Sequence, residues 1–235
     1  MNNQFLKMKY KNEFYTRNKN ELIKESKDEL ARIENGEPLH KVLGYIEMTN
    51  LKINVEKDVL IPRYETEELV FLAKKYINKK SDVLDLCTGS GYIALALKKM
   101  TNANITASDI SNEAIEQTKI NAKINNLDIE VVKSDLFENI KKKFDVIVSN
   151  PPYIPEDNKL SDSVINHEPH LALFGGKDGN DIYKLIMKDV FKFLNKDGII
   201  IFEISEDNVD YFRKNNFKII KDINNKNRIA LLSRK

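Results

Sequence analysis

Residues 82–97, DVLDLCTGSGYIALAL, join a short apolar run to an amphipathic stretch through a turn that contains Gly89 and Gly91. Asp109 stands 20 residues after Gly89, at the end of the next apolar run, NITASD. Glycines let the backbone turn sharply beside a ligand, and the start of the following helix offers free N–H groups. A carboxylate after the second strand can accept hydrogen bonds from ribose hydroxyls. The stretch therefore predicts a βαβ unit with a nucleotide site at the carboxyl edge of its strands.

The rest of the chain continues this alternation. Further apolar runs lie at 129–132, 144–149 and 198–204, separated by helical stretches such as NEAIEQTKINAKINN. Strands that alternate with helices form a parallel sheet with both faces covered. The last two runs, at 217–223 and 228–233, are too close together for a crossover helix, so we expect them to be antiparallel. The predicted fold is α/β and Rossmann-like, with a mostly parallel seven-stranded sheet and an antiparallel C-terminal hairpin.

The N-terminal part has a different pattern. Residues 1–40 are polar and helix-prone, with a narrow apolar stripe that stops before Gly36. The stripe consists of Leu22, Ile23, Leu30 and Ile33. Residues 42–61 alternate apolar and polar side chains around Thr49-Asn50, which predicts a β-hairpin. We expect a short helical N-terminal cap at 1–40, a linking β-hairpin at 41–61 and the main domain at 62–235.

Composition excludes several classes of protein. Hydrophobic residues make up 41% and charged residues 31% of the 235 residues, the balance of a folded globular protein. The 38 basic and 36 acidic side chains leave a charge of +2, too even for a protein that holds nucleic acid mainly through its overall field. No stretch approaches the about 18 apolar residues of a membrane helix, and the start, MNNQFLKMKYKN, lacks the apolar core of a secretion signal. We expect a cytoplasmic protein without a membrane segment.

No metal site is expected either. Cys87 is the single cysteine, so it can form neither an internal disulfide nor a thiolate metal site. His167 and His170 lie in HEPH, without the i, i+4 spacing of a helical zinc motif.

The glycine turn leaves the identity of the ligand open. Gly89-x-Gly91-x-x-Ala94 also satisfies the dinucleotide fingerprint, so alone it does not separate NAD from another adenosine ligand. A tight turn without a ligand is the simplest alternative, and the position of Asp109 argues against it. Two further features favour S-adenosylmethionine: Asp85, just before the turn, can hold a ligand ammonium, and Asp135 and Leu136 after the third strand suit the polar edge and the flat face of adenine.

The most specific motif follows the fourth strand as Asn150-Pro151-Pro152-Tyr153. Two prolines end the strand and fix the backbone, which leaves Asn150 at the carboxyl end where ligands bind in such sheets. The Asn150 side-chain oxygen and the Pro151 carbonyl can each accept one hydrogen of a planar –NH2 group, and Tyr153 can stack on its plane. The alternative is that the two prolines only end the strand. Because the motif follows a predicted cofactor turn, we favour a site that orients a nitrogen toward a sulfonium methyl.

Four segments together resemble the release-factor glutamine methyltransferases: PRYETEELV (62–70), DLCTGSGYIALAL (85–97), FDVIVSNPPYIP (144–155) and EPHLALFGGKDGNDIY (168–183). The similarity covers the chain from about residue 38 onward. Asn-Pro-Pro-Tyr alone is shared with amino-methyltransferases that act on adenine or guanine, whereas the first and last segments indicate the protein-glutamine branch. The resemblance implies a class I methyltransferase that moves a methyl group from S-adenosyl-L-methionine to the side-chain nitrogen (N5) of the glutamine in the Gly-Gly-Gln motif of class I peptide chain release factors.

The resemblance also implies roles for individual residues. The cofactor would contact Cys87, Thr88, Gly89, Ser90, Gly91, Asp109, Asp135, Leu136 and Asn150, with Asp85, Arg63, Glu65 and Thr66 near its methionine end. Asn150, Pro151, Pro152 and Tyr153 would hold the glutamine, with Asn150, Pro151 and Tyr153 as the catalytic residues, and Glu168 would organise the wall. No general base is assigned. We expect a monomer that binds release factors and holds no nucleic acid stably.

Three departures from the family pattern stand out. Cys87 replaces a usual glycine at the cofactor turn, Tyr64 replaces a usual proline, and the segment before the hairpin is shorter than the family's helical bundle. Three alternatives remain: a methyltransferase for adenine or guanine amino groups, an NAD-dependent dehydrogenase, and a cofactor-binding module without catalysis. The chain shows no basic recognition block, which the first alternative would need. It also shows no histidine base and no space for a nicotinamide half-site, which the second would need.

Overall fold

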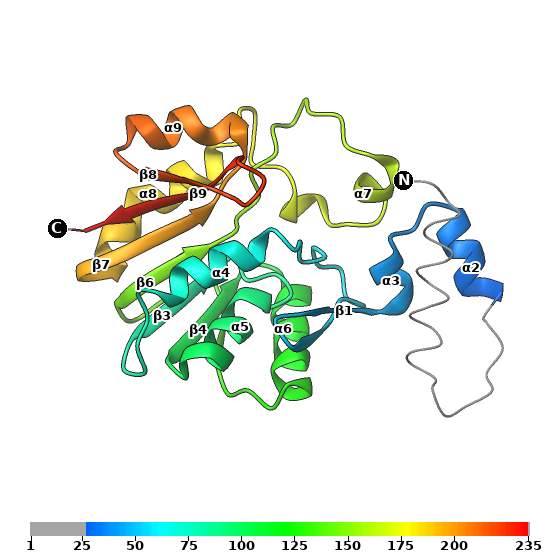
Figure 1. The fold of residues 1–235 in the computed structure, drawn as a ribbon, viewed down its shortest axis with the longest axis horizontal. Helices are drawn as coiled ribbons and strands as arrows, with labels where there is room; N and C mark the ends of the chain where they lie inside the picture. Colours follow the sequence, from blue (N-terminus) through cyan, green and yellow to red (C-terminus); the bar gives the residue numbers. More distant parts are fainter. Residues whose placement is uncertain (1–26, 235) are drawn as a thin grey trace.

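A computed structural model describes residues 27–234 of the chain, with a seven-stranded sheet at its centre (Figure 1). The strands are β3 (Asp82–Leu86), β4 (Asn104–Asp109), β5 (Glu130–Lys133), β6 (Phe144–Ser149), β7 (Leu194–Glu203), β8 (Lys218–Lys221) and β9 (Asn227–Ser233). They lie in the order β5-β4-β3-β6-β7-β9-β8. The first five of these are parallel, and β9 runs antiparallel to both β7 and β8. The predicted mostly parallel sheet with an antiparallel C-terminal hairpin is confirmed.

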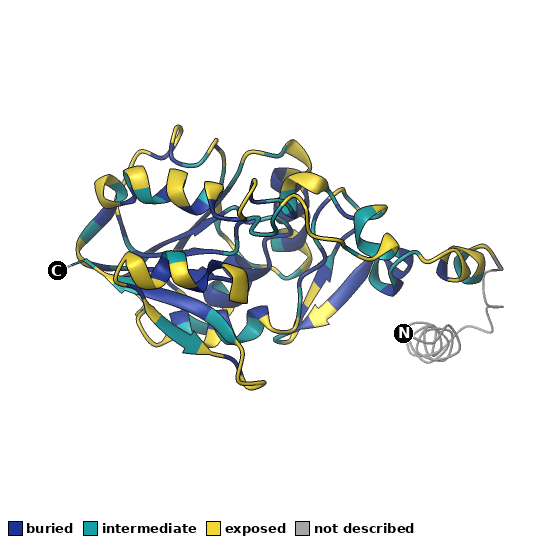
Figure 2. Cartoon of the chain, turned by 90° about the horizontal axis from the view of Figure 1, so that it is seen from above, coloured by how far each residue is buried: buried dark blue, intermediate teal, exposed yellow. Residues whose placement is uncertain are grey.

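Side chains alternate between two cores on the two faces of the sheet. In β6, Val146 and Val148 belong to one buried cluster and Ile147 to the other. The first cluster includes residues of α4 (Thr66–Lys74), α5 (Tyr92–Thr101) and α6 (Asn112–Ile124); the second includes residues of α8 (Asp181–Phe193) and α9 (Val209–Lys214). Figure 2 shows the result as buried strands beneath helices whose outer faces are exposed. Strands buried on both faces explain why the sequence shows continuous apolar runs.

One strand differs from its sequence prediction. β7 begins at Leu194, whereas the apolar run begins at Gly198. Asp197 has a φ of 61°, and the pairing with β6 shifts register between Phe144 and Val146. The residues before Gly198 therefore belong to the strand, through an irregular segment. Because these residues are mostly polar, the sequence pattern does not indicate a strand there.

The linking hairpin is present as predicted. β1 (Tyr45–Met48) pairs antiparallel with β2 (Leu51–Asn54), and Thr49 and Asn50 form the turn with φ values of 46° and 57°. Positive φ at both central residues is the two-residue turn whose twist matches that of the strands. The apolar side of the hairpin joins the first core, so the hairpin packs on the α5 side of the sheet.

The N-terminal cap is described only in part. α2 (Lys27–Glu34) ends before Gly36, whose φ of 90° agrees with the predicted helix end, and α3 (Leu39–Leu43) follows. Both contribute to a small separate cluster around Ile33. Leu22 and Ile23 of the predicted stripe lie outside the described residues, and the division into segments 1–40, 41–61 and 62–235 stays a prediction.

Short helices interrupt the long connections at the carboxyl edge: α7 (Asp162–Ile165), η1 (His170–Ala172) and η2 (Glu206–Asn208). Within residues 27–234, none of the helices has the length and apolar character needed to cross a membrane.

Candidate active site

A cavity opens at the carboxyl edge of β3, β4 and β6, where the strand order changes direction. Ligands bind at such switch points because the loops there diverge to opposite faces of the sheet. With its open mouth the cavity encloses about 1160 Å³ of empty space. The predicted site residues that line it are Thr66, Cys87, Thr88, Gly89, Ser90, Asp109, Asp135, Leu136, Asn150 and Pro152.

The remaining predicted residues lie outside the cavity wall. They are Arg63, Glu65, Asp85, Gly91, Pro151, Tyr153 and Glu168. For these residues a contact with ligand stays a prediction; the structure shows other contacts for Arg63, Asp85, Gly91, Tyr153 and Glu168.

The glycine turn depends on backbone conformations that ordinary side chains avoid. Gly89 and Gly91 have φ values of 56° and 83°. A Cβ on Gly91 would lie 2.9 Å from two side-chain atoms of Thr118 in α6, so the contact with that helix requires glycine here. A Cβ on Gly89 would meet nothing within 4 Å. Because Gly89 lines the cavity, this free space is available to a ligand that approaches the backbone closely.

Cys87 shares this left-handed conformation, with a φ of 62°. The cost for a residue with a Cβ is about 1–2 kcal/mol, which gives a physical reason for the glycine that is usual there in the family. Burial raises the pKa of the Cys87 thiol, so the thiol stays protonated at neutral pH.

Asp109 joins the second strand to the glycine turn. One of its carboxylate oxygens accepts a hydrogen bond from the Gly89 N–H at 2.9 Å, and the other accepts one from the Ser111 N–H at 2.9 Å. Burial raises the pKa of the Asp109 carboxyl. The carboxylate has about four lone-pair sites and lines the cavity, so it can still accept a hydrogen bond from a ribose hydroxyl.

Asp85 lies beneath the turn, fully buried. Its Oδ2 accepts hydrogen bonds from the Thr88 hydroxyl at 2.5 Å and from the Ala94 N–H at 3.0 Å, which joins the two ends of the turn. Its Oδ1 has no partner among the described residues. Loss of water around the carboxyl raises the pKa of Asp85 to about 7.

The Asn-Pro-Pro-Tyr turn places only part of itself in the cavity. Asn150 and Pro152 line it, next to the glycine turn. Tyr153 instead donates its hydroxyl to Oε1 of Glu203, a buried carboxylate at the end of β7, at 3.3 Å. Burial raises the pKa of the Tyr153 phenol. The predicted stacking of Tyr153 on the substrate amide is therefore not visible in this structure and stays a prediction.

Glu168 holds the segment that contains Arg63. One of its oxygens lies 2.5 Å from Nη2 of Arg63, and the other accepts the Ile61 N–H at 3.0 Å. The side chain of Glu168 is only 1% exposed. Both carboxylate oxygens thus have partners within the protein. Glu168 therefore stabilises the segment that contains Ile61 and Arg63 and is not a free acid or base.

The sequence prediction missed the segment after the hairpin, where Asp58, Val59 and Leu60 line the cavity. Side chains from distant parts of the chain hold this segment. The Lys41 amine donates to the carbonyls of Val55, Lys57 and Val59 at 2.7–3.1 Å, and Gln117 of α6 accepts the Lys57 N–H at 3.0 Å. Nothing in the local pattern indicates these anchors, because each one comes from another element.

Apolar residues of the outer wall were also missed. They are Ile110, Pro169, Leu171, Ala172, Ile182 and Leu185. Ile110 follows Asp109 directly, so its position beside the nucleotide site could have been inferred; the residues of η1 and α8 carry no such signal.

Asn121 of α6 connects the hairpin to the glycine turn. Its amide nitrogen donates to the carbonyls of Asn54 and Ser90 at 2.9 and 2.8 Å, and its oxygen accepts the Asn54 N–H at 2.8 Å. The side chain is fully buried and nearly saturated with hydrogen bonds. The hairpin and the cofactor turn are therefore held as one unit through α6.

The arrangement fits an adenosine ligand beside an amide-binding turn. A carboxylate stands at the end of β4, an unobstructed glycine faces the cavity, and Leu136 lies after β5 with a φ of 43°, a strained conformation for a bulky residue. No group of three His, Cys, Asp or Glu side chains in the described part of the chain is arranged to hold a metal ion.

Comparisons with known proteins agree with this geometry. A family model described as "Methyltransferase small domain" matches residues 68–171. A "Release factor glutamine methyltransferase" from Streptococcus pneumoniae is 43% identical over 171 residues, which are 71% of this chain and 61% of that protein. A protein of the same description from Agrobacterium fabrum is 42% identical over 200 residues, 77% of this chain and 69% of its own.

Among solved structures, a ribosomal protein L11 methylase from Lactobacillus delbrueckii subsp. bulgaricus has a TM-score of 0.55 and 25% identity. The match covers 75% of this chain and 82% of that one. The strand order, the antiparallel C-terminal hairpin and the cavity at the switch point define a class I methyltransferase. Within that class, the chain belongs to the release factor glutamine methyltransferase family. The chain spans 61% of the length of the Streptococcus pneumoniae relative, less than two thirds, and 69% of the Agrobacterium fabrum relative.

Proposed function

We propose that this protein transfers a methyl group from S-adenosyl-L-methionine to N5 of the glutamine in the Gly-Gly-Gln motif of class I peptide chain release factors. One observation carries the proposal: Asn150 and Pro152 lie in the same cavity as the glycine turn and Asp109. An amide bound at the first turn would thus face a cofactor held by the second. The descriptions of the relatives support glutamine as the acceptor.

On this proposal the protein's residues bind and orient rather than exchange protons. The turn from Cys87 to Gly91 would contact the methionine part of the cofactor, Asp109 its ribose and Leu136 its adenine. S-adenosylmethionine supplies a methyl group already activated on a sulfonium sulfur. Holding both reactants in line then provides much of the rate enhancement that a displacement needs.

The acceptor amide is fixed by two oxygens. The Asn150 side-chain oxygen and the Pro151 carbonyl each accept one amide hydrogen, which aims the nitrogen at the methyl carbon. The nitrogen–carbon bond forms as the carbon–sulfur bond breaks, and the nitrogen then loses one proton to solvent or to a backbone carbonyl. No side chain is assigned as general base, since Glu168 is engaged by Arg63 and Ile61.

We also propose that the protein acts as a cytoplasmic monomer and binds its protein substrate without holding nucleic acid stably. The net charge of +2 supports the last point. Methylation of adenine or guanine is the second candidate, and it is less favoured because relatives that are 42–43% identical to this chain are described as release factor glutamine methyltransferases.

The decisive experiment incubates the purified protein with S-adenosylmethionine and a class I release factor and follows the Gly-Gly-Gln peptide by mass spectrometry. We expect a gain of about 14 Da, one CH2 group, on the glutamine. Parallel reactions with tRNA, rRNA and plasmid DNA and a labelled cofactor test the second candidate. Cofactor binding without transfer to any of these acceptors would indicate a non-catalytic module.

A further inference from the structure

The segment behind the Asn-Pro-Pro-Tyr turn is packed against that turn so tightly that two of its glycines leave no room for a side chain. This segment, residues 173–181, is called the bracket here. A Cβ on Gly175 would lie 2.6 Å from the Pro152 carbonyl oxygen, and a Cβ on Gly179 would lie 2.3 Å from the Tyr153 carbonyl oxygen. Both atoms belong to the backbone, so neither can move aside cheaply.

Hydrogen bonds fix the bracket to the same turn. The Ile154 N–H donates to the Leu173 carbonyl at 3.0 Å, and the Gly175 N–H donates to the Ile154 carbonyl at 2.9 Å. Farther along, the Glu156 N–H donates to the Gly176 carbonyl at 3.2 Å. The bracket therefore sets the path of the backbone that follows Pro152.

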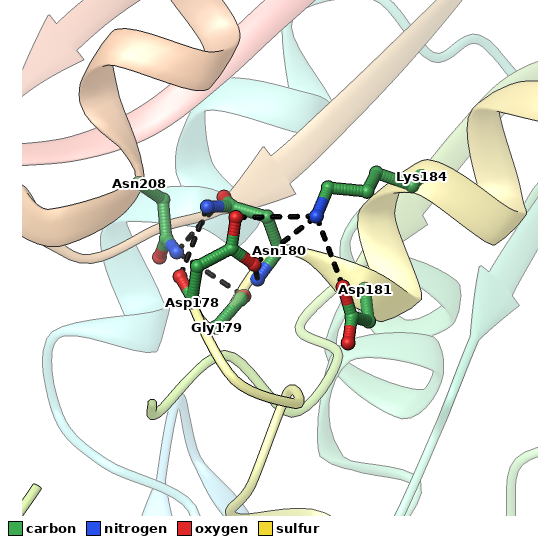
Figure 3. Close-up of polar contacts among 6 residues, drawn as sticks. All are labelled: Asp178, Gly179, Asn180, Asp181, Lys184 and Asn208. Carbon is green, nitrogen blue, oxygen red and sulfur yellow. Dashed lines mark hydrogen bonds and ion pairs between the residues drawn. The ribbon is translucent and has the colours of Figure 1, made fainter. Parts of the chain in front are cut away.

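The bracket is in turn held by η2, the short helix that follows β7. Asn208, at the end of η2, is fully buried, and its amide nitrogen donates to the Gly179 carbonyl at 3.2 Å and to Oδ1 of Asn180 at 3.1 Å. Its own Oδ1 accepts from the Ser205 N–H and hydroxyl. Figure 3 shows Asn208 facing Gly179 and Asn180, while Lys184 faces Asp178 and Asp181 on the opposite side.

Two supports of the turn thus converge near the end of β7. Glu203, the last residue of β7, accepts the Tyr153 hydroxyl, and Asn208 a few residues later holds Gly179 against the Tyr153 carbonyl. We propose that Asn208 is a positioning residue for methyl transfer, acting through Gly179 to fix the Asn150–Tyr153 turn. This inference rests on the proposed function, and Asn208 itself touches neither substrate nor cofactor.

The substitution Asn208→Asp isolates the contact. It keeps the oxygen that accepts from Ser205, but it replaces the amide donor with an oxygen that faces the Gly179 carbonyl. We expect kcat for release-factor methylation to fall about 10- to 100-fold, because small displacements of reacting groups have effects of that size. We expect the Kd for S-adenosylmethionine to stay within about twofold, because the glycine turn and Asp109 are held by hydrogen bonds that involve Asp85, Ser111 and Asn121 and not the bracket.

Hydrogen–deuterium exchange provides a readout that needs no acceptor. In Asn208→Asp, exchange in residues 150–156 should accelerate while exchange in residues 85–97 stays unchanged. Gly179→Ala should give the same pattern by pushing on the Tyr153 carbonyl. Asn215→Ala is the matched control, because the side chain of this exposed asparagine at the α9 C-terminus donates to the Tyr211 carbonyl, away from the bracket.

Unchanged exchange in residues 150–156 would overturn the inference, as would a kcat within about twofold of the wild type. Equal loosening of residues 85–97, with a parallel loss of cofactor affinity, would show that Asn208 supports the whole domain and would also overturn it. Absence of methylation by the wild-type protein would instead count against the proposed function, and the exchange result would still decide the role of Asn208.

Discussion

The two turns that meet in the cavity are held by different parts of the chain. The glycine turn is held by residues of the successive elements β3, β4 and α6: Asp85, Asp109 and, 31 residues from Ser90, Asn121. The Asn-Pro-Pro-Tyr turn is held by the bracket and by Glu203, which is 50 residues from Tyr153. The first half of the site is therefore held within one run of consecutive elements, β3 to α6, whereas the second is held by segments that follow it much later in the chain.

Because the two turns are held by different contacts, we expect substitutions near one turn to leave the other turn unchanged. Changes near the glycine turn should act on cofactor affinity, and changes near the Asn-Pro-Pro-Tyr turn should act on kcat. The following experiments test how far that separation holds.

The largest effect is expected for Asn150→Ala, which removes one of the two proposed amide acceptors. We expect kcat to fall at least about 100-fold, the loss typical of an oriented hydrogen-bonding group in an active site. Steady-state kinetics with a release factor would measure it. Asn158→Ala, at an exposed position of the same loop, serves as the control. An Asn150→Ala variant that keeps most of its kcat would rule out the two-oxygen clamp.

A smaller effect is expected for Asp109→Asn, and it should appear in the cofactor affinity and not in kcat. Hydrogen bonds to charged groups contribute about 1.5–3 kcal/mol, so the Kd for S-adenosylmethionine should rise about 10- to 100-fold. Isothermal titration calorimetry measures this directly, with the exposed Asp128→Asn as control. If the Kd did not change while kcat fell, the assignment of Asp109 to the ribose would be wrong.

The third effect concerns pH. The pKa of Asp85 is raised in the folded protein to about 7 from an ordinary value of 3.8, so the folded state binds a proton more tightly than the unfolded state does. Its contribution to stability is present below the ordinary pKa and is lost as the pH rises through 7. The slope is at most about 1.4 kcal/mol per pH unit.

Urea unfolding at several pH values between 4 and 8 would show this slope. The wild type should lose free energy of unfolding toward pH 7, and Asp85→Asn should lose less, because its amide does not ionise. Burial also raises the pKa of Asp109 and of Glu203, so part of the slope should remain in the variant. Identical slopes for the two proteins would contradict a raised pKa at Asp85.

The smallest effect is expected at Cys87. Its positive φ favours glycine, so Cys87→Gly should change the free energy of unfolding by less than about 1 kcal/mol, because relief of strain offsets the added chain entropy. Cys87→Val should destabilise more, since a β-branched residue is poorly tolerated there. Urea denaturation would compare the two. We also expect bound cofactor to slow alkylation of the Cys87 thiol. Alkylation at an unchanged rate would show that the cofactor does not cover the thiol.

Much of the sheet and half of the site follow from sequence patterns. The strands are continuous apolar runs, and the glycine turn and Asp109 have fixed spacing from their strands, so local rules suffice to place them at one edge. Thr49-Asn50 likewise indicates its own turn.

The rest depends on contacts that no local pattern records. Lys41, Gln117 and Glu168 each bond to backbone groups of the segment after the hairpin, far away along the chain. Tyr153 was expected in the amide site, but its hydroxyl bonds to Glu203, and only the folded sheet brings these two residues together. The start of β7 was misjudged because polar residues extend the strand through an irregular pairing.

The Lys41 amine donates hydrogen bonds to three carbonyl groups, and this limits how far the protein can be shortened from its N-terminus. A shortened version that began at β1 would keep the glycine turn and the Asn-Pro-Pro-Tyr motif, but residues 55–59 beside the cavity would lose three hydrogen bonds. A shortened protein that keeps this wall in place would therefore have to begin before Lys41, ahead of the first strand.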